Sequence, residues 1–172
     1  MFLGKDYPAY DPTQYFDYLR RRFEPEFIVP NSLREITRQI YPDTSQTLSL
    51  VEQMVEKGKR LFLMSKFLPQ KEEYQLIGYT KMQLKDCYEN EKTIWDLFIQ
   101  NNLLQNNDNE IVSHYIGESP ATKELGTTAP GNIGAFTGWQ IVKKYMNENS
   151  KTLKELMEAD PEIIFEKAKY KP

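Results

Sequence analysis

The sequence is poor in side chains that bind transition metals or form cross-links, with one cysteine, Cys87, and one histidine, His114. A single cysteine excludes an intramolecular disulfide and a CxxC zinc or redox site. Zinc catalysis needs about three protein ligands, commonly including two histidines one helical turn apart. We therefore expect no metal site and no cofactor in this chain.

Other catalytic patterns are also absent from the sequence. It contains no G-x-S-x-G or S-x-x-K serine motif, and residues 106–110 lack the turn glycine of a calcium loop. Acidic pairs such as Glu72 and Glu73 lie among polar residues, where nothing would separate the pKa values of the two carboxyl groups. The residues by themselves indicate no enzyme active site.

Long apolar runs are missing as well. No segment approaches the roughly 20 apolar residues that span a bilayer, and residues 1–6 (MFLGKD) are too short and too soon acidic for a signal peptide. These features predict a chain that is soluble as given. Residues 1–4 resemble the end of an apolar element without its beginning, which favours a further segment upstream of Met1.

Neither sign of charge dominates, since 22 Lys and Arg face 25 Asp and Glu, for a formal net charge of -3. This balance argues against nucleic acid as a partner. The most basic run, Arg20–Arg22, is followed by Glu24 and Glu26. That order predicts a solvated helix face with no binding role.

What the sequence does contain is helical periodicity, with helix-start signals ahead of several apolar stripes. The predicted helices cover residues 12–23, 30–40, 45–68, 80–104 and 130–146, and two short helices follow Thr152 and Asp160. Residues 75–78 and 110–115 are the only strand candidates. We predict one irregular all-α domain over residues 1–172, with about six to seven helices and at most a short strand remnant.

The most distinctive segment, residues 129–142, carries Gly131, Gly134 and Gly138 at spacings that share one helical face. Each glycine inside a helix costs about 1 kcal/mol relative to alanine, so three together favour the close approach of another backbone. No GxGxxG or GK[ST] pattern indicates a phosphate cradle here. Pro130, the three glycines and Trp139 are therefore a candidate packing surface, with a ligand or partner surface as the alternative.

Several strings, taken together and in order, resemble the gliding-motility lipoprotein family GldB of Bacteroidetes-type bacteria. They are MFLGKDYP (1–8), FIVP (27–30), IGYT (77–80), PGNIG (130–134) with GWQIV (138–142), and IFEKAKYKP (164–172). The resemblance spans the whole chain. It implies the C-terminal portion of a longer lipoprotein, whose signal and lipid-carrying cysteine lie upstream, because Cys87 cannot be that cysteine.

That family is in turn distantly similar to predicted zinc peptidases with an HExxH helix and a later EG motif. The similarity would align the metal helix with residues 29–36 and the EG pair with Lys57 and Gly58. This sequence has Asn31, Ser32, Arg34 and Glu35 in the first segment and a cation, Lys57, where the third zinc ligand belongs. It therefore implies a degenerate, zincin-like helical half without catalytic, cofactor or metal residues.

The resemblance implies a non-catalytic component of the gliding-motility apparatus and the linked type IX secretion pathway. We expect it on the periplasmic face of the envelope, as an outer-membrane lipoprotein that binds other envelope proteins and meets the membrane only through a lipid anchor. Two alternatives remain. One is a hydrolase half whose metal ligands lie upstream, and the other is a small-ligand-binding module at the helix start near Pro130.

Overall fold

The computed structural model describes residues 4–8, 10, 15–126 and 128–172, and the regular structure in these ranges is entirely helical. The predicted all-α fold is thereby confirmed. None of the helices in the described part of the chain is both long and apolar enough to cross a membrane. The helices of the described residues are α1 (Asp17–Arg20), α2 (Ile28–Ile40), α3 (Leu50–Phe67), α4 (Glu73–Ile77), α5 (Lys81–Glu89), α6 (Glu91–Gln100), α7 (Asn109–Ile116), α8 (Ile133–Glu148), α9 (Leu153–Glu158) and α10 (Pro161–Ala168), with short 3-10 turns at Arg21–Phe23, Pro25–Phe27 and Lys123–Leu125.

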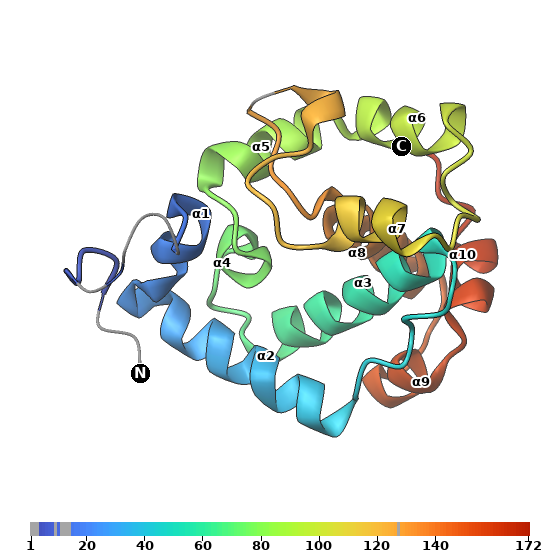
Figure 1. Cartoon of the computed structure of the whole chain (residues 1–172). Helices are drawn as coiled ribbons and strands as arrows, with labels where there is room; N and C mark the ends of the chain where they lie inside the picture. Colours follow the sequence, from blue (N-terminus) through green and yellow to red (C-terminus); the bar gives the residue numbers. More distant parts are fainter. Residues whose placement is uncertain (1–3, 9, 11–14, 127) are drawn as a thin grey trace.

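Two long helices, α3 and α8, form the centre of the fold, and α10 packs against both (Figure 1). Met54 of α3 and Phe136 and Trp139 of α8 are fully buried between them. At the crossing, a Cβ atom on Gly138 would lie 1.7 Å from the Met54 carbonyl oxygen, and one on Gly58 would lie 2.2 Å from the Gly138 carbonyl oxygen. Only glycine allows the two backbones to approach this closely.

Side-chain caps begin several of the helices at the expected places. Thr80 and Thr152 accept hydrogen bonds from the backbone N–H groups of Gln83 and Glu155, and Asp160 caps the proline-led α10. Helix α3 begins at a capping box on Ser49, four residues after its predicted start at residue 45. These local hydrogen bonds satisfy N–H groups that the first helical turn leaves unpaired.

The predicted helix over residues 80–104 is two helices, α5 and α6, which meet at Asn90. The Asn90 side chain donates a hydrogen bond of 2.8 Å to the carbonyl oxygen of Asp86, and its backbone leaves helical geometry (φ -114°, ψ 21°). An asparagine side chain that bonds the backbone in this way competes with the helical ladder. Because this break leaves the apolar periodicity intact, the sequence pattern predicted one continuous helix.

Both strand candidates are wrong. Residues 75–78 lie in and just after α4, which a Glu72–Gln75 capping box begins and Gly78, in the left-handed region, ends. Residues 110–115 lie within α7, where Asp108 accepts hydrogen bonds from the N–H groups of Glu110 and Ile111. In both cases a cap at the helix start outweighs the β-branched and aromatic residues that follow it.

The two N-terminal helices also differ from the predictions. The proposed start at Asp11 and Pro12 lies outside the described residues, and the helix in that region, α1, spans only Asp17–Arg20. Helix α2 begins at Ile28, with Pro30 in its first turn, where a missing N–H costs little. The apolar periodicity of this helix lies on Leu33, Ile36 and Ile40, and Leu33 packs against the core, whereas Ile36 and Ile40 are 51% and 65% exposed.

Helix α8 begins at Ile133, three residues later than predicted, because Asn132 adopts a left-handed backbone conformation (φ 57°, ψ 35°) at its N-cap. Gly131 therefore precedes the helix and does not share a helical face with Gly134 and Gly138. A Cβ atom on Gly131 would instead meet the backbone and side chain of Ser119.

Candidate functional site

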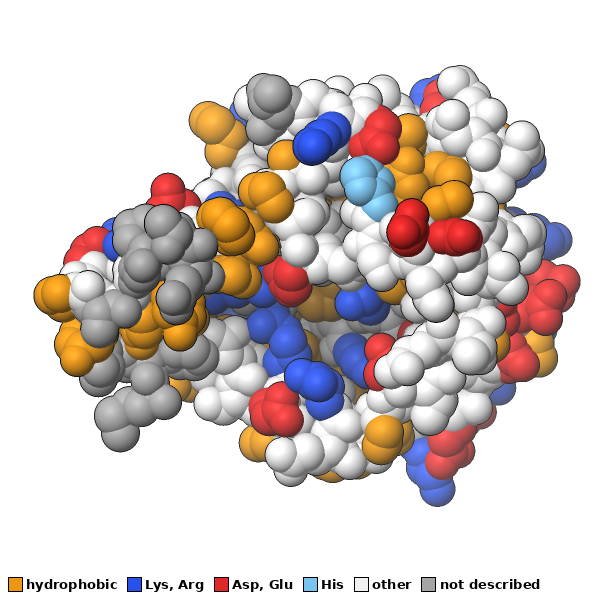
Figure 2. Space-filling view, in the orientation of Figure 1, with side chains coloured by type: hydrophobic (Ala, Val, Ile, Leu, Met, Phe, Trp, Pro, Cys, Tyr) orange, Lys and Arg blue, Asp and Glu red, His pale blue; other side chains and the backbone are white. Residues whose placement is uncertain are grey.

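A cavity of about 380 Å³ opens between α2, α3, the end of α4 and the start of α8. Its polar lining includes five cationic side chains: Arg22, Arg34, Arg38, Lys57 and Arg60. Two carboxylates, Asp43 and Glu118, also line it, and five positive and two negative groups leave a formal excess of three positive charges. In Figure 2, Lys and Arg side chains gather around a hollow near the centre of the face.

The cationic side chains come from three separate segments of the chain. Arg34 and Arg38 are one turn apart on α2, Lys57 and Arg60 are three residues apart on α3, and Arg22 belongs to the 3-10 turn after α1. Residues at spacings of three and four share one face of a helix. The cavity forms where the facing sides of α2 and α3 meet this turn.

Hydrogen bonds to the backbone fix two of these arginines. Arg34 donates to the carbonyl oxygen of Leu76 at 2.6 Å and to the Asn31 side chain at 2.8 Å, while Asn31 donates to the carbonyl oxygen of Arg22 at 3.0 Å. Arg60 donates to the carbonyl oxygens of Glu56 at 2.8 Å and of Tyr41 and Pro42 at 3.3 Å, and it pairs with the Glu56 carboxylate at 3.3 Å. These contacts hold both guanidinium groups in place.

Several polar atoms at the cavity have no partner within the described residues. They include the buried Nε atoms of Arg22 and Arg60 and the Oδ1 atom of Asn132. Arg22 pairs through its Nη1 atom with Glu118 at 2.9 Å. The Nζ atom of Lys57 makes neither a hydrogen bond nor an ion pair with any described residue. Buried polar groups in folded proteins are usually paired, so this concentration marks the cavity as unusual.

The cationic environment perturbs the titration of the groups around it. Burial lowers the pKa of Lys57, against the attraction of Asp43 and Glu118, and the nearby charges of Arg60 and Arg34 lower it further. Burial and the charge of Arg22 lower the pKa of Arg34 to about 10. Each shift reflects the cost of holding a positive charge in this partly enclosed, like-charged place.

The two carboxylates respond in the opposite sense. Burial alone would raise the pKa of Glu118, but the hydrogen bond and charge of Arg22 outweigh it, so the pKa is lowered. Burial would likewise raise the pKa of Asp43, and hydrogen bonds from the Ser45 hydroxyl and backbone N–H lower it instead. Both carboxylates stay charged at neutral pH without balancing the cations.

Two of the five degenerate metal-site positions line this cavity, namely Arg34 and Lys57. Asn31 accepts a hydrogen bond from Arg34. Ser32 and Glu35 are exposed, and Glu35 pairs with Arg38 at 3.4 Å. Residues of both segments named from the resemblance, 29–36 and Lys57, thus lie at this cavity. The sequence analysis did not identify Arg22, Arg38 or Arg60 as site residues. The spacing of the cations on α2 and α3, one turn apart on each helix, could have indicated a shared cationic face.

The expectation for the basic run is wrong for Arg22. Its side chain is 15% exposed, and it lines the cavity instead of a solvated helix face. Local sequence could not show this, because its partner Glu118 is 96 residues away.

The glycine segment lies beside the cavity, inside the protein. Pro130, Gly131, Gly134, Gly138 and Trp139 are all buried. None of the five lines the cavity, but their neighbours Asn132 and Ala135 do. The first turn of α8 therefore forms one wall of the site, while the glycines pack against other segments.

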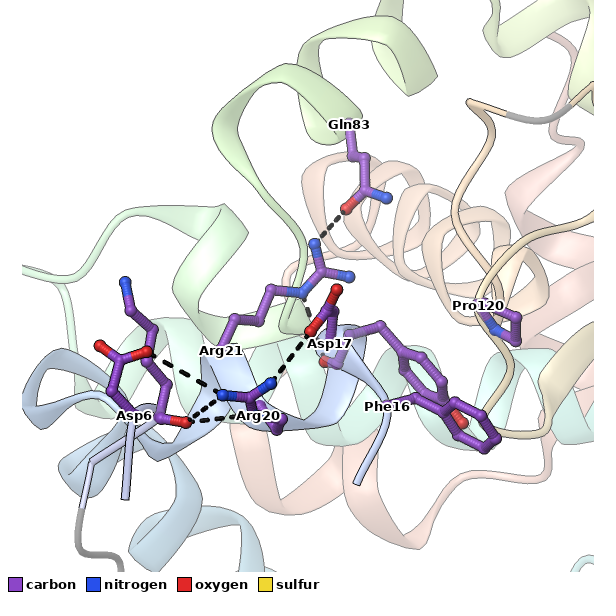
Figure 3. A pocket seen from close by; sticks show the side chains of 9 residues that line it. Asp6, Phe16, Asp17, Arg20, Arg21, Gln83 and Pro120 are labelled. Atoms are coloured by element: carbon purple, nitrogen blue, oxygen red, sulfur yellow. Dashed lines mark hydrogen bonds and ion pairs between the residues drawn. The ribbon is translucent and has the colours of Figure 1, made fainter. Parts of the chain in front are cut away.

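A second hollow, of about 750 Å³, lies beside α1 (Figure 3). Its charged groups largely satisfy one another: Arg20 donates to the carbonyl oxygen of Lys5 at 2.8 Å and pairs with Asp17 at 3.4 Å, and Arg21 donates to Gln83 at 3.0 Å. The dashed lines in Figure 3 mark these contacts. Because its polar atoms are paired, this hollow offers a weaker site than the cationic cavity.

The remaining metal-ligand candidates have structural partners. Glu52, Asp160 and Glu162 bring carboxylate oxygens within 4.8 Å of one another, but Glu52 accepts from the Ser49 N–H and Asp160 from the Glu162 N–H as helix caps. His114 pairs with Glu124 at 2.9 Å. Carboxylates in capping roles do not define a metal site.

The fold and the site together define an all-helical domain with a cationic cavity that opens at the surface. The chain belongs to the family of the gliding motility protein GldB, whose family model matches residues 1–172. This membership associates it with gliding motility and with the lipoproteins of the cell envelope. Comparison with curated proteins and with solved structures gave no match.

Proposed function

We propose that this chain is a non-catalytic component of the gliding-motility apparatus and acts by binding other envelope proteins. The observation that carries the proposal is the identity of the residues at the aligned metal-site positions. Arg34 and Lys57 are cations that line one cavity with three further cations. Such a cavity repels a zinc ion, which supports a role without metal chemistry.

Family membership supports the location that we propose for the full-length protein. A lipid anchor would hold it at the periplasmic face of the outer membrane, where it would serve gliding and the linked type IX secretion pathway. The name of the family supports the lipoprotein and motility parts of this proposal.

The outer face of α2 supports a role in protein binding. Ile28, Val29, Ile36 and Ile40 are each between 46% and 65% exposed on this one helix, and Phe67 at the end of α3 is 59% exposed. Ile36, Ile40 and Phe67 line a common groove. Exposed apolar residues that gather in this way are typical of surfaces that contact another protein.

Metal content and thermal melting of the full-length protein test the non-catalytic part of the proposal. We expect no stoichiometric zinc and no change in Tm with zinc or chelator, because a bound ion would stabilise the folded state by linkage. Stoichiometric zinc with a chelator-sensitive melt would instead favour a hydrolase whose ligands lie upstream.

Genetic complementation tests the binding part. In a strain that lacks the gene, we expect the double variant Ile36→Ser and Ile40→Ser to accumulate normally but to fail to restore gliding, because both side chains are exposed. The matched control is Ile99→Ser with Ile163→Ser, which changes two exposed isoleucines elsewhere. Full rescue by the α2 variant would remove this face from the proposal.

A further inference from the structure

The cationic cavity is lined by more positive than negative groups, and only some of its cations are paired with carboxylates. Five cations and two carboxylates line about 380 Å³. Arg22 pairs with Glu118, Arg38 with Glu35 and Arg60 with Glu56. This leaves Arg34 and Lys57 without an ion pair among the described residues. Like charges that share a partly desolvated space repel each other strongly, because the effective dielectric constant there is lower than in water. A bound anion would remove this repulsion.

Lys57 provides the donor that remains unused, since its Nζ atom has no partner among the described residues. The unpaired Nε atoms of Arg22 and Arg60 are buried, and Arg60 uses its Nη atoms within the protein, so these arginines contribute mainly their charge. Guanidinium and ammonium groups are the side chains that proteins use for phosphate and carboxylate ligands. The Asn132 amide, whose oxygen is also unpaired, can present its NH₂ group by rotation.

The start of α8 adds an independent contribution. Asn132 and Ala135 line the cavity, and no side chain caps the first turn of this 16-residue helix. Unpaired N–H groups and the helix dipole give a helix N-terminus partial positive charge, which favours an anion. The dipole therefore adds to the field of the five side chains.

The rest of the lining sets the size and character of the ligand. Leu61, Met64, Ile77 and Ala135 provide apolar surface next to the cations. The volume lies near the lower end for small-molecule sites, so it fits a compact ligand and not a folded partner. We propose that this cavity binds a small phosphomonoester, with the dianionic phosphate paired to Lys57 in the field of the surrounding arginines and an apolar part against Leu61 and Met64.

Calorimetry on the purified protein, with phenyl phosphate as probe, tests this proposal. We expect saturable one-to-one binding, at least tenfold tighter than binding of inorganic phosphate, because only phenyl phosphate fills the apolar part. Phenol, which lacks the charge, is expected not to bind. Equal affinity for phenol, or tighter binding of succinate than of phenyl phosphate, would overturn the assignment to a phosphate ester.

Lys57→Met is the informative variant, because Lys57 makes no hydrogen bond or ion pair with a described residue and its loss should not disturb the fold. We expect at least a tenfold loss of affinity for phenyl phosphate. Lys66→Met is the matched control, since Lys66 is exposed on the same helix outside the cavity. An equal loss in both variants would mean that the binding is only non-specific charge attraction.

Methionine methyl NMR signals locate the bound probe. Met64 lines the cavity and Met82 is 73% exposed elsewhere, so phenyl phosphate should shift the first signal and leave the second unchanged. Sedimentation with vesicles that contain phosphatidic acid, compared with phosphatidylcholine alone, separates a lipid headgroup from a soluble ester as the source of the phosphate. No saturable binding in any of these arms would refute the proposal. This result is separate from the zinc and gliding tests, since the cavity site does not depend on the proposed protein-binding role.

Discussion

At the scale of single residues, Lys57 carries a positive charge under two unfavourable conditions. It is partly buried, and other cations lie nearby. Burial lowers its pKa, and Arg60 and Arg34 lower it further, while Asp43 and Glu118 offset only part of this effect. The folded state therefore holds this proton less tightly than the unfolded chain does. A residue that costs stability in this way is typical of functional sites.

Lys57→Met should therefore stabilise the free protein, in contrast to most substitutions at partly buried positions. We expect the free energy of unfolding to rise by about 0.5–2 kcal/mol, the range that single stabilising substitutions commonly give. Urea unfolding at pH 7 measures this change, with Lys66→Met as the control that should stay within about 0.5 kcal/mol of the parent. A loss of stability in Lys57→Met would show that the ammonium group supports the fold.

The pH dependence of this difference follows from the direction of the shift. Because the pKa of Lys57 is lower in the folded state, its charge destabilises the protein at every pH below the folded value. The cost fades as the pH rises toward the unfolded value of about 10.4, where the lysine is neutral in both states. Lys57→Met and the parent should differ most near pH 7 and least near pH 10, in urea unfolding at both pH values.

At the scale of elements, the crossing of α3 and α8 organises the fold. Their backbones touch through Gly58 and Gly138, and the adjoining Met54 and Trp139 are fully buried. The start of α8, and with it Asn132 and Ala135, reaches the cavity because this crossing fixes the helix relative to α3. A change at the crossing should thus affect both stability and the site.

Gly138→Ala tests the crossing directly. Its new Cβ atom would lie 1.7 Å from a backbone oxygen, which cannot move without displacing the helix. We expect a loss of about 3 kcal/mol, at the upper end of overpacking effects, measured by urea unfolding. Asn147→Ala, an exposed position on the same helix, should change stability by less than about 0.5 kcal/mol. A Gly138→Ala protein of parental stability would mean that α3 and α8 are farther apart than described.

At the scale of the whole molecule, the cationic cavity contrasts with an overall net charge of -3. The total charge therefore conceals a local excess of the opposite sign, which acts only over the short distance set by salt screening. A ligand that binds the folded state at this site must raise its stability, whatever the ligand does in the cell.

Phenyl phosphate should raise Tm in a way that depends on salt. At a concentration of 100 times Kd, binding adds about 2.7 kcal/mol to the free energy of unfolding. We expect the added stability to fall when sodium chloride rises from roughly 0.05 to 0.5 M, because screening weakens exposed charge interactions. Thermal melts of the parent and of Lys57→Met, at both salt concentrations, provide the comparison. A salt-independent shift would contradict an electrostatic site.

The sequence by itself determined the helical class and many of the helix starts. Caps such as Thr80 with Gln83 and Asp160 with Pro161 act over a few residues, so their effect can be predicted from neighbours alone. The break at Asn90 is also local, but its side-chain hydrogen bond leaves the apolar pattern unchanged. The exposed face of α2 could not be foreseen, because apolar periodicity does not reveal whether a neighbouring element covers it.

Only the tertiary structure decided where the site lies. Arg22, Lys57 and Glu118 are far apart along the chain and meet because α2, α3 and α8 pack around one cavity. Glycine spacing indicated a close backbone approach, but the Gly58 partner became apparent only from the crossing. Local hydrogen bonds and periodicity fix helices within a few residues, whereas a cavity depends on contacts across the whole chain. For this reason the sequence specified the elements, and their packing created the cationic site.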